Sequence, residues 1–230
     1  MGYTEREIIK MCDMAMDNIA TFYQQDFINY RGKASDTDEY YTEIIAEYIL
    51  QHIENFRTQI PVITRSSSYD QNHEGTYKEG TGRDEEVIAI KMFLQSNVGA
   101  PYDYIGKIID YQTPLKSKKS DVAGKIDLLS YDGHILRVLE LKKASSDETM
   151  LRCVLEGYTY LCTVDVDKLL ADFKLPPNTE VCSSPFVFRN GKQWEEWAEK
   201  RPMLMELMDK LDSKPFFIES KEGKYKVTED

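Results

Sequence analysis

The stretch GKIDLLSYDGHILRVLELKK, residues 124–143, decides the fold of this chain. Its centre, Asp132-Gly133, separates two runs of apolar and alternating residues that span 122–131 and 134–142. Asp-Gly favours a two-residue hairpin turn, because glycine adopts positive φ without a steric penalty. The stretch therefore predicts two neighbouring antiparallel strands.

A two-residue turn would bring three polar residues to one face of this hairpin. It would place Asp127 opposite Val138, and the alternation of side chains along a strand then puts Glu140 and Lys142 on the same face. Diagonal neighbours of this kind lie about 7–8 Å apart, so the two carboxylates could share one divalent cation while the lysine approaches the same centre. A register shift of one residue would separate them.

Two carboxylates and a lysine placed in this way suit the hydrolysis of a phosphodiester. The carboxylates of Asp127 and Glu140 are ligands that Mg²⁺ or Mn²⁺ would bind, and the backbone carbonyl of Leu141 could add another. A bound metal acidifies water and neutralises charge on the phosphate, and Lys142 would assist the attacking water or stabilise the same charge. The alternative is an ordinary ion pair on an exposed strand face, with Lys125 opposite Glu140.

Hydrophobic periodicity and turn residues predict further elements on both sides of the hairpin. We expect helices over 3–30, 38–57, 84–97, 147–163 and 191–211, strands over 103–112 and 180–189, and a terminal hairpin over 216–229. Asp36 or Thr37 could cap the second helix. The order helix, three strands, helix, strand indicates a mixed α/β (α+β) fold. We divide the chain into N-terminal helices and a polar loop over 1–82, a core over 83–190, and a C-terminal helix and hairpin over 191–230 that pack on the core.

The spacing of Asp127 from Glu140-Leu141-Lys142 resembles the motif of the PD-(D/E)XK nuclease superfamily. The sequence from Gly124 to Asp127 is similar to the GxxD element of the RecB-like branch of that superfamily, in which the Asp and the Glu hold the metal. The resemblance implies a restriction-endonuclease-like αβββαβ core, here with an N-terminal helical extension. It also implies a nuclease that depends on Mg²⁺ or Mn²⁺, with DNA favoured over RNA as substrate.

The same resemblance adds residues on the two core helices. The first core helix of the superfamily usually bears a metal-associated Glu. Of Glu85 and Glu86 we favour Glu86, because apolar residues four and seven positions further on continue its stripe. The helix after the ELK motif carries Gln-xxx-Tyr in the RecB-like branch, and here Glu156 and Tyr160 occupy those positions. Both are expected to contact substrate, although the Gln-to-Glu change adds negative charge and puts this contact in question.

Lysines between two of the predicted strands are further candidates for contacting phosphate. Lys118 and Lys119 lie there, and a solvated loop is the alternative reading. The net charge of −11 opposes nonspecific binding of nucleic acid, which gains affinity when Lys and Arg release counterions. The exception is residues 101–150, where eight basic residues balance eight acidic ones. A nucleic-acid partner would therefore meet the middle of the chain.

Other features exclude several kinds of protein. The four cysteines are scattered without a CxxC pair, which indicates free thiols and excludes zinc-finger and iron–sulfur sites. No GxxxxGK[ST] motif is present, so an ATP-driven activity is not expected. No apolar run approaches the roughly 18 residues needed to span a bilayer, and no secretory signal pattern is present, so the expected compartment is the cytoplasm.

The acidic charge leaves two alternatives to a nuclease open. One is a nuclease-like fold that serves as a binding or assembly module without catalysis, which Glu156 also favours. The other is an effector that needs a partner before it acts. For the nuclease itself, the acidic N-terminal helices indicate a homodimer or a protein partner.

Overall fold

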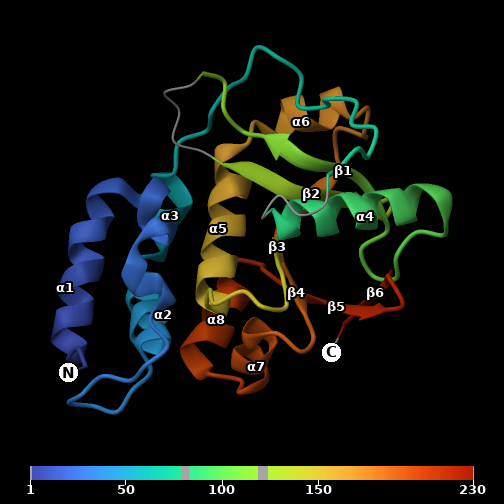
Figure 1. The fold of residues 1–230 in the computed structure, drawn as a ribbon. Coiled ribbons are helices and arrows are strands. Elements are labelled where there is room, and N and C mark those ends of the chain that lie inside the picture. Colours follow the sequence, from blue (N-terminus) through green and yellow to red (C-terminus); the bar gives the residue numbers. More distant parts are fainter. Residues whose placement is uncertain (1, 79–82, 119–123, 230) are drawn as a thin grey trace.

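The computed structural model describes residues 2–78, 83–118 and 124–229. It has a mixed α/β fold built on one curled six-stranded sheet with strand order β1-β2-β3-β4-β5-β6 (Figure 1). The strands are β1 (Lys107–Pro114), β2 (Lys125–Tyr131), β3 (Ile135–Lys142), β4 (Glu180–Phe188), β5 (Phe216–Lys221) and β6 (Lys224–Thr228). The helices are α1 (Glu5–Ala15), η1 (Met16–Gln24), η2 (Asp26–Asn29), α2 (Tyr41–Gln51), α3 (Ile53–Thr58), α4 (Asp84–Val98), α5 (Met150–Thr163), α6 (Val166–Asp172), α7 (Lys192–Ala198) and α8 (Pro202–Lys210).

The sheet is antiparallel at both edges and parallel in the middle. Strands β1, β2 and β3 pair antiparallel, β4 lies parallel to β3 and β5 parallel to β4, and β6 returns antiparallel. The parallel step from β3 to β4 requires a crossover, which α5 and α6 supply. The predicted α/β class is confirmed, and α4, β1, β2, β3, α5 and β4 follow one another in the predicted order, with α6 added before β4.

Both faces of the sheet are covered, and β3 runs through the middle of the core. Its even-numbered residues Leu136 and Val138 belong to the cluster that contains α5, whereas Leu139 and Leu141 belong to the cluster that contains α4. A strand with neighbours on both sides and helices on both faces is buried along its length. Polar residues near the end of β3 are therefore buried as well.

The turn between β2 and β3 is longer than predicted. Leu129 pairs with Val138, a register two residues away from the predicted one. Asp132 explains the longer turn, because its Oδ1 accepts hydrogen bonds from the N–H groups of His134 and Ile135, both at 2.9 Å. A shift of two residues preserves which side chains share a face, since the alternation has a period of two.

The predicted N-terminal helices are wrong in their lengths. Helix α1 begins with a capping box between Thr4 and Glu7 but ends at Ala15, and two 3₁₀ segments follow in place of one helix over 3–30. Asn18 interrupts the first of them with extended backbone angles (φ −144°, ψ 79°).

The second predicted helix, over 38–57, also differs. Helix α2 starts later, after Tyr40, so neither Asp36 nor Thr37 caps it, and it is separated from α3 at His52, whose φ is −114° and ψ 19°.

The single helix predicted over 191–211 is also wrong. The chain leaves the helix at Lys200, whose φ is 52°, and a new helix, α8, starts at Pro202. Proline lacks the N–H group that a continuing helix would need, but it is tolerated in the first turn. The terminal hairpin is confirmed, and β5 joins it to the sheet beside β4.

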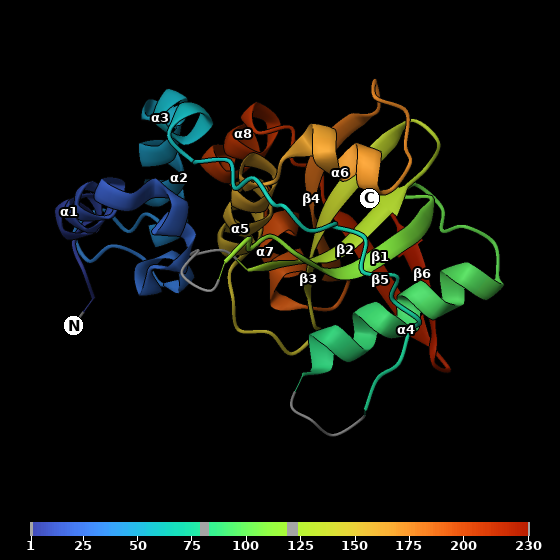
Figure 2. The ribbon, with the colours of Figure 1, turned by 90° about the horizontal axis from the view of Figure 1, so that it is seen from above.

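The N-terminal helices lie on the α5 side of the sheet, whereas α4 covers the opposite face (Figures 1 and 2). Buried Glu43 in α2 fixes this arrangement, because its carboxylate accepts the N–H groups of Met203 and Leu204 at the start of α8, at 2.8 and 2.9 Å. A carboxylate at a helix N-terminus satisfies unpaired N–H groups there. Within the described residues, no helix is long and apolar enough to cross a membrane.

Candidate functional site

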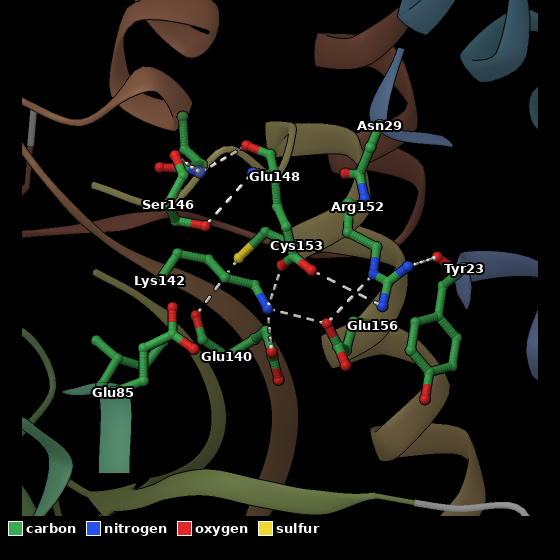
Figure 3. Close-up of polar contacts among 12 residues, drawn as sticks. Tyr23, Asn29, Glu85, Glu140, Lys142, Ser146, Glu148, Arg152, Cys153 and Glu156 are labelled. Carbon is green, nitrogen blue, oxygen red and sulfur yellow. Dashed lines mark hydrogen bonds and ion pairs between the residues drawn. The ribbon is translucent and has the colours of Figure 1, made fainter. Parts of the chain in front are cut away.

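A buried lysine surrounded by carboxylates lies where β3 ends and α5 passes over the sheet (Figure 3). The Nζ atom of Lys142 is 2.8 Å from Glu140, 2.6 Å from Glu148 and 3.0 Å from Glu156. Glu140 is 3% exposed and Lys142 5% exposed, so the reading as an ion pair on an exposed strand face is wrong. We call Lys142 and these three glutamates the Lys142 cluster.

The alternation of β3 accounts for the position of this cluster. Glu140 and Lys142 continue the even-numbered residues of β3, which face α5. Helix α5 packs on this face at Gly157, where an added Cβ atom would lie in ordinary van der Waals contact with the Cβ of Glu140, at 3.4 Å. Thr149 starts α5 by accepting the N–H of Arg152 at 3.1 Å.

Lys142 is held in its charged form. Burial disfavours the ammonium, but the carboxylates of Glu140 and Glu156 outweigh it and raise the pKa of Lys142 well above its usual value. A lysine that stays protonated donates hydrogen bonds and offers positive charge, and it does not act as a base at neutral pH.

The two carboxylates predicted as metal ligands are disfavoured as anions in the absence of a cation. Burial, reinforced by the charge of Glu156, raises the pKa of Glu140 well above its usual value despite the neighbouring Lys142. Its Oε2 atom is buried and has no hydrogen-bond partner among the described residues. Burial also raises the pKa of Asp127 to about 7, although Lys142 and the N–H of Leu141 oppose this shift.

Asp127 is anchored from two strands. Its Oδ2 accepts the backbone N–H of Leu141 at 3.0 Å, and its Oδ1 accepts the Nε2 group of Gln112 at 2.9 Å. Gln112 has a φ of 50°, an unusual conformation for a residue inside a strand. The structure thus brings Asp127 beside the backbone of Leu141, the residue between Glu140 and Lys142. That Asp127 and Glu140 share one metal ion stays a prediction. Gln112 was missed, because no sequence pattern signals this backbone conformation.

Glu156 and Tyr160 lie on one face of α5 at the predicted site. The Tyr160 hydroxyl donates to Glu156 Oε1 at 2.9 Å. Burial raises the pKa of Glu156, but Lys142 and Arg152 outweigh it and lower the pKa below its usual value. Sterics explain the glycine of the GxxD element, because a Cβ atom on Gly124 would lie 2.1 Å from the Tyr160 hydroxyl. This position therefore excludes every side chain while Tyr160 keeps its place.

The two glutamates of α4 have different contacts. Glu85 Oε1 accepts the backbone N–H of Lys143 at 3.0 Å, directly after the ELK motif, whereas Glu86 pairs with Arg83 at 3.4 Å. Both border a pocket of about 260 Å³ that also contains Asp127, which we call the Asp127 pocket. The choice of Glu86 as a metal ligand stays a prediction, and these contacts favour Glu85.

The remaining predicted residues have less direct positions. The Leu141 side chain is fully buried, and its residue pairs with Phe186 of β4. Lys118 is exposed beyond the end of β1. Lys119 lies outside the described residues.

Two charged residues of the site were not predicted. Arg152 lies 3.4 Å from Glu156, one helical turn away, a spacing that the sequence could have revealed. Glu148 lies in the loop before α5, where the sequence gives no signal. Arg31, between η2 and α2, donates to the carbonyl groups of Asp147 and Glu148 and pairs with Glu196, so the N-terminal part of the chain holds this loop in place.

The site carries more acidic than basic side chains. Its charged members are Asp127, Glu140, Glu148, Glu156, Lys142 and Arg152. Buried negative charge without compensation is costly, so such carboxylates either take up protons or bind a cation. Within the described parts of the chain, however, no three His, Cys, Asp or Glu side chains converge closely enough to hold a metal ion by themselves.

Comparisons with known proteins give no relative from which a role could be transferred. No protein-family model matches the chain, and neither the curated proteins nor the solved structures contain a significant match.

Proposed function

We propose that this protein is a divalent-metal-dependent nuclease with a restriction-endonuclease-like αβββαβ core of the PD-(D/E)XK type. One observation carries the proposal: buried Glu140 pairs with buried Lys142 at 2.8 Å, and Asp127 accepts the backbone N–H of Leu141 between them, with the pKa values of both carboxyl groups raised. The sequence order Asp, Glu-x-Lys and the order of elements from α4 to β4 support the same assignment.

The donor set fits Mg²⁺ or Mn²⁺ bound through few protein ligands. Asp127 and Glu140 would hold the ion, and the partnerless Oε2 of Glu140 is the atom best suited to it. Mg²⁺ is commonly bound through one or two carboxylates, with waters and substrate phosphate oxygens in its other positions. The ion would acidify water and neutralise charge on the phosphate. Whether Leu141 and Glu86 contribute as well stays a prediction.

Lys142 would act as a fixed positive charge. Because Glu140, Glu148 and Glu156 keep it protonated, it would offer positive charge to the attacking water or to a phosphate oxygen, and a hydrogen bond once one of these glutamates turns to the metal. A preorganised donor of this kind stabilises charge that develops in the transition state. Glu156 and Tyr160 would border the substrate from α5.

The test is cleavage of single- and double-stranded DNA and of RNA with Mg²⁺ or Mn²⁺. Asp127→Ala and Lys142→Ala should lose cleavage, and Lys107→Ala is the matched control, since Lys107 is an exposed lysine at the start of β1 and lines neither the Lys142 cluster nor the pocket of Asp127. Equal cleavage by the parent and the two site variants would refute the assignment of those residues. Preference for RNA would correct the substrate alone.

A second candidate is a nuclease-like module that binds without catalysis. The contacts of Lys142 favour it, because three glutamates already satisfy the ammonium and one of them, Glu156, stands where the RecB-like branch has Gln. A ligand that binds only the folded state raises the melting temperature. The absence of any thermal shift with Mn²⁺ would support this candidate. A homodimer or a partner bound through the N-terminal helices stays a prediction.

A further inference from the structure

A second pocket adjoins the Lys142 cluster through Glu156. It has a volume of about 310 Å³, and its walls come from η1, from the ends of β1 and β2, and from α5. We call it the η1 pocket. We propose that the η1 pocket binds a phosphate group of an unpaired nucleic-acid strand next to the scissile bond, with Lys116 and Arg152 as its cationic ligands. This inference rests on the proposed nuclease function, and it assigns part of the substrate site to the N-terminal segment.

Cations outnumber carboxylates in the η1 pocket, whereas carboxylates outnumber cations in the Asp127 pocket. The η1 pocket contains two cations, Lys116 and Arg152, and one carboxylate, Glu156. The Asp127 pocket contains four carboxylates and two cations, namely Asp84, Glu85, Glu86, Asp127, Arg83 and Lys143. In a chain with a net charge of −11, an excess of cations beside the site is the exception. A phosphate is attracted to the first pocket and a metal ion to the second.

Lys116 is fixed in the wall of the η1 pocket through its backbone. The buried guanidinium of Arg65 donates to the Lys116 carbonyl and also to Ser67 Oγ at 2.8 Å. It lies over the ring of Tyr69 at 5.2 Å, so the anchor is itself packed. The side chain of Lys116 is exposed, which leaves its ammonium able to contact a ligand in the pocket.

Arg152 is oriented toward the η1 pocket by η1 itself. Its guanidinium donates to the carbonyl of Tyr23 and lies 4.9 Å from the centre of the Tyr23 ring. Its ion pairs with Glu156 and Glu148 are long, at 3.4 and 3.9 Å. A guanidinium has five N–H donors in a planar fork that matches a phosphate, and long contacts of this kind can be exchanged for such a ligand.

The remaining walls are polar and leave room for a single strand. Gln24 donates to the Tyr23 hydroxyl at 2.8 Å, and Tyr23 packs edge-on against Tyr160 at 5.9 Å. Both rings are buried, so they offer edges and hydroxyl groups rather than stacking faces. A volume of about 310 Å³ lies at the lower end of small-ligand pockets. The η1 pocket therefore accommodates one nucleotide of an unpaired strand.

The experiment measures binding of a fluorescent single-stranded DNA oligonucleotide by anisotropy, with Ca²⁺ present and over a series of salt concentrations. Each phosphate contact contributes about 0.7 to the slope of log K against log salt for single strands. We expect Lys116→Ala to reduce the slope by about 0.7, and Arg152→Gln to reduce it by a similar amount. Lys107→Ala is the matched control, because Lys107 is an exposed lysine at the other end of β1 and should leave the slope unchanged.

The outcomes separate this inference from the proposed function. Slopes that are equal for Lys116→Ala and Lys107→Ala overturn the phosphate subsite, even if the parent cleaves DNA. A reduced slope supports the subsite, and a parent that then fails to cleave with Mg²⁺ or Mn²⁺ refutes only the nuclease activity. A parent that binds no single strand, or that binds a blunt duplex more tightly, also overturns the inference. Melting temperatures show whether each variant is folded.

Discussion

The Asp127 pocket and the η1 pocket differ in charge and in origin, and only the η1 pocket borders the Lys142 cluster directly, through Glu156. The first is acidic and is formed by core elements, namely α4 and the strands β1 to β3. The second has an excess of cations, and η1 from the N-terminal segment closes it. The difference indicates that the Asp127 pocket would hold a metal ion and the η1 pocket would hold the substrate strand. Under this proposal the N-terminal segment would form part of the substrate site.

The largest effect is expected at Lys142, in the centre of the charged cluster. Lys142→Ala should reduce metal-dependent cleavage about 10²–10³-fold, as does the loss of one preorganised charge-stabilising donor in other enzymes. It should also destabilise the metal-free fold by about 3–5 kcal/mol, because the buried Glu140 and Glu156 and the half-buried Glu148 lose their cation. Activity assays and thermal melts measure the two effects. A variant as stable and as active as the control Lys107→Ala would contradict the role of Lys142.

A second large effect is expected at Gly124, on the wall of the η1 pocket. Gly124→Ala should destabilise the protein by about 1–3 kcal/mol, the usual cost of overpacking, because its Cβ would lie 2.1 Å from the Tyr160 hydroxyl. Tyr160→Phe removes that hydroxyl, so the double variant should recover part of the loss. Chemical denaturation of the three variants measures this. A double variant with strictly additive losses would show that the clash is not the cause.

Replacing the two α4 carboxylates of the Asp127 pocket one at a time shows which of them supports metal binding. Glu85 contacts the chain directly after Lys142, whereas Glu86 pairs with Arg83. Glu85→Gln should therefore weaken Mn²⁺ binding about 10-fold, the lower end of the losses seen for outer-shell partners, and Glu86→Gln should weaken it less. Calorimetry of the two variants measures the difference. The reverse order would restore Glu86 as the helix residue nearest the metal.

The smallest effect is a pH dependence in the absence of metal. Because the pKa of Asp127 is raised to about 7 in the folded state, the fold favours its protonated form, and stability is lost as the pH rises from the ordinary range of an Asp through about 7. Asp127→Asn cannot ionise. Its free energy of unfolding, relative to that of the parent, should therefore rise by on the order of 1–2 kcal/mol between pH 5 and pH 8. If the melting temperatures of the parent and of Asp127→Asn change equally over this range, ionisation of Asp127 does not destabilise the fold.

The sequence was sufficient to predict the central strands and the polar residues that they bring together. Glu140 and Lys142 share the face of β3 toward α5 because side chains alternate along a strand, and a register change of two residues preserves this alternation. Asp127 contacts β3 through the backbone N–H of Leu141. The order of elements from α4 to β4 was predictable because each has a clear period and clear turn residues at its ends.

The residues that escaped prediction depend on tertiary contacts. Glu148 reaches Lys142 from a loop that Arg31 holds, across more than one hundred residues of sequence. Gln112 reaches Asp127 only because its backbone has a positive φ. Local patterns also failed at Asn18 and Lys200, where apolar periodicity continues although the backbone leaves the helix.

The most direct test of the account is calorimetric titration of Mn²⁺ into the parent protein and into Glu140→Gln at pH 8. We expect the parent to bind the ion with Asp127 and Glu140 as ligands, and Glu140→Gln to lose this binding while it keeps the parent's fold. A parent that binds no Mn²⁺, or a variant that binds it as tightly as the parent, would contradict the proposal that these buried carboxylates form a metal site.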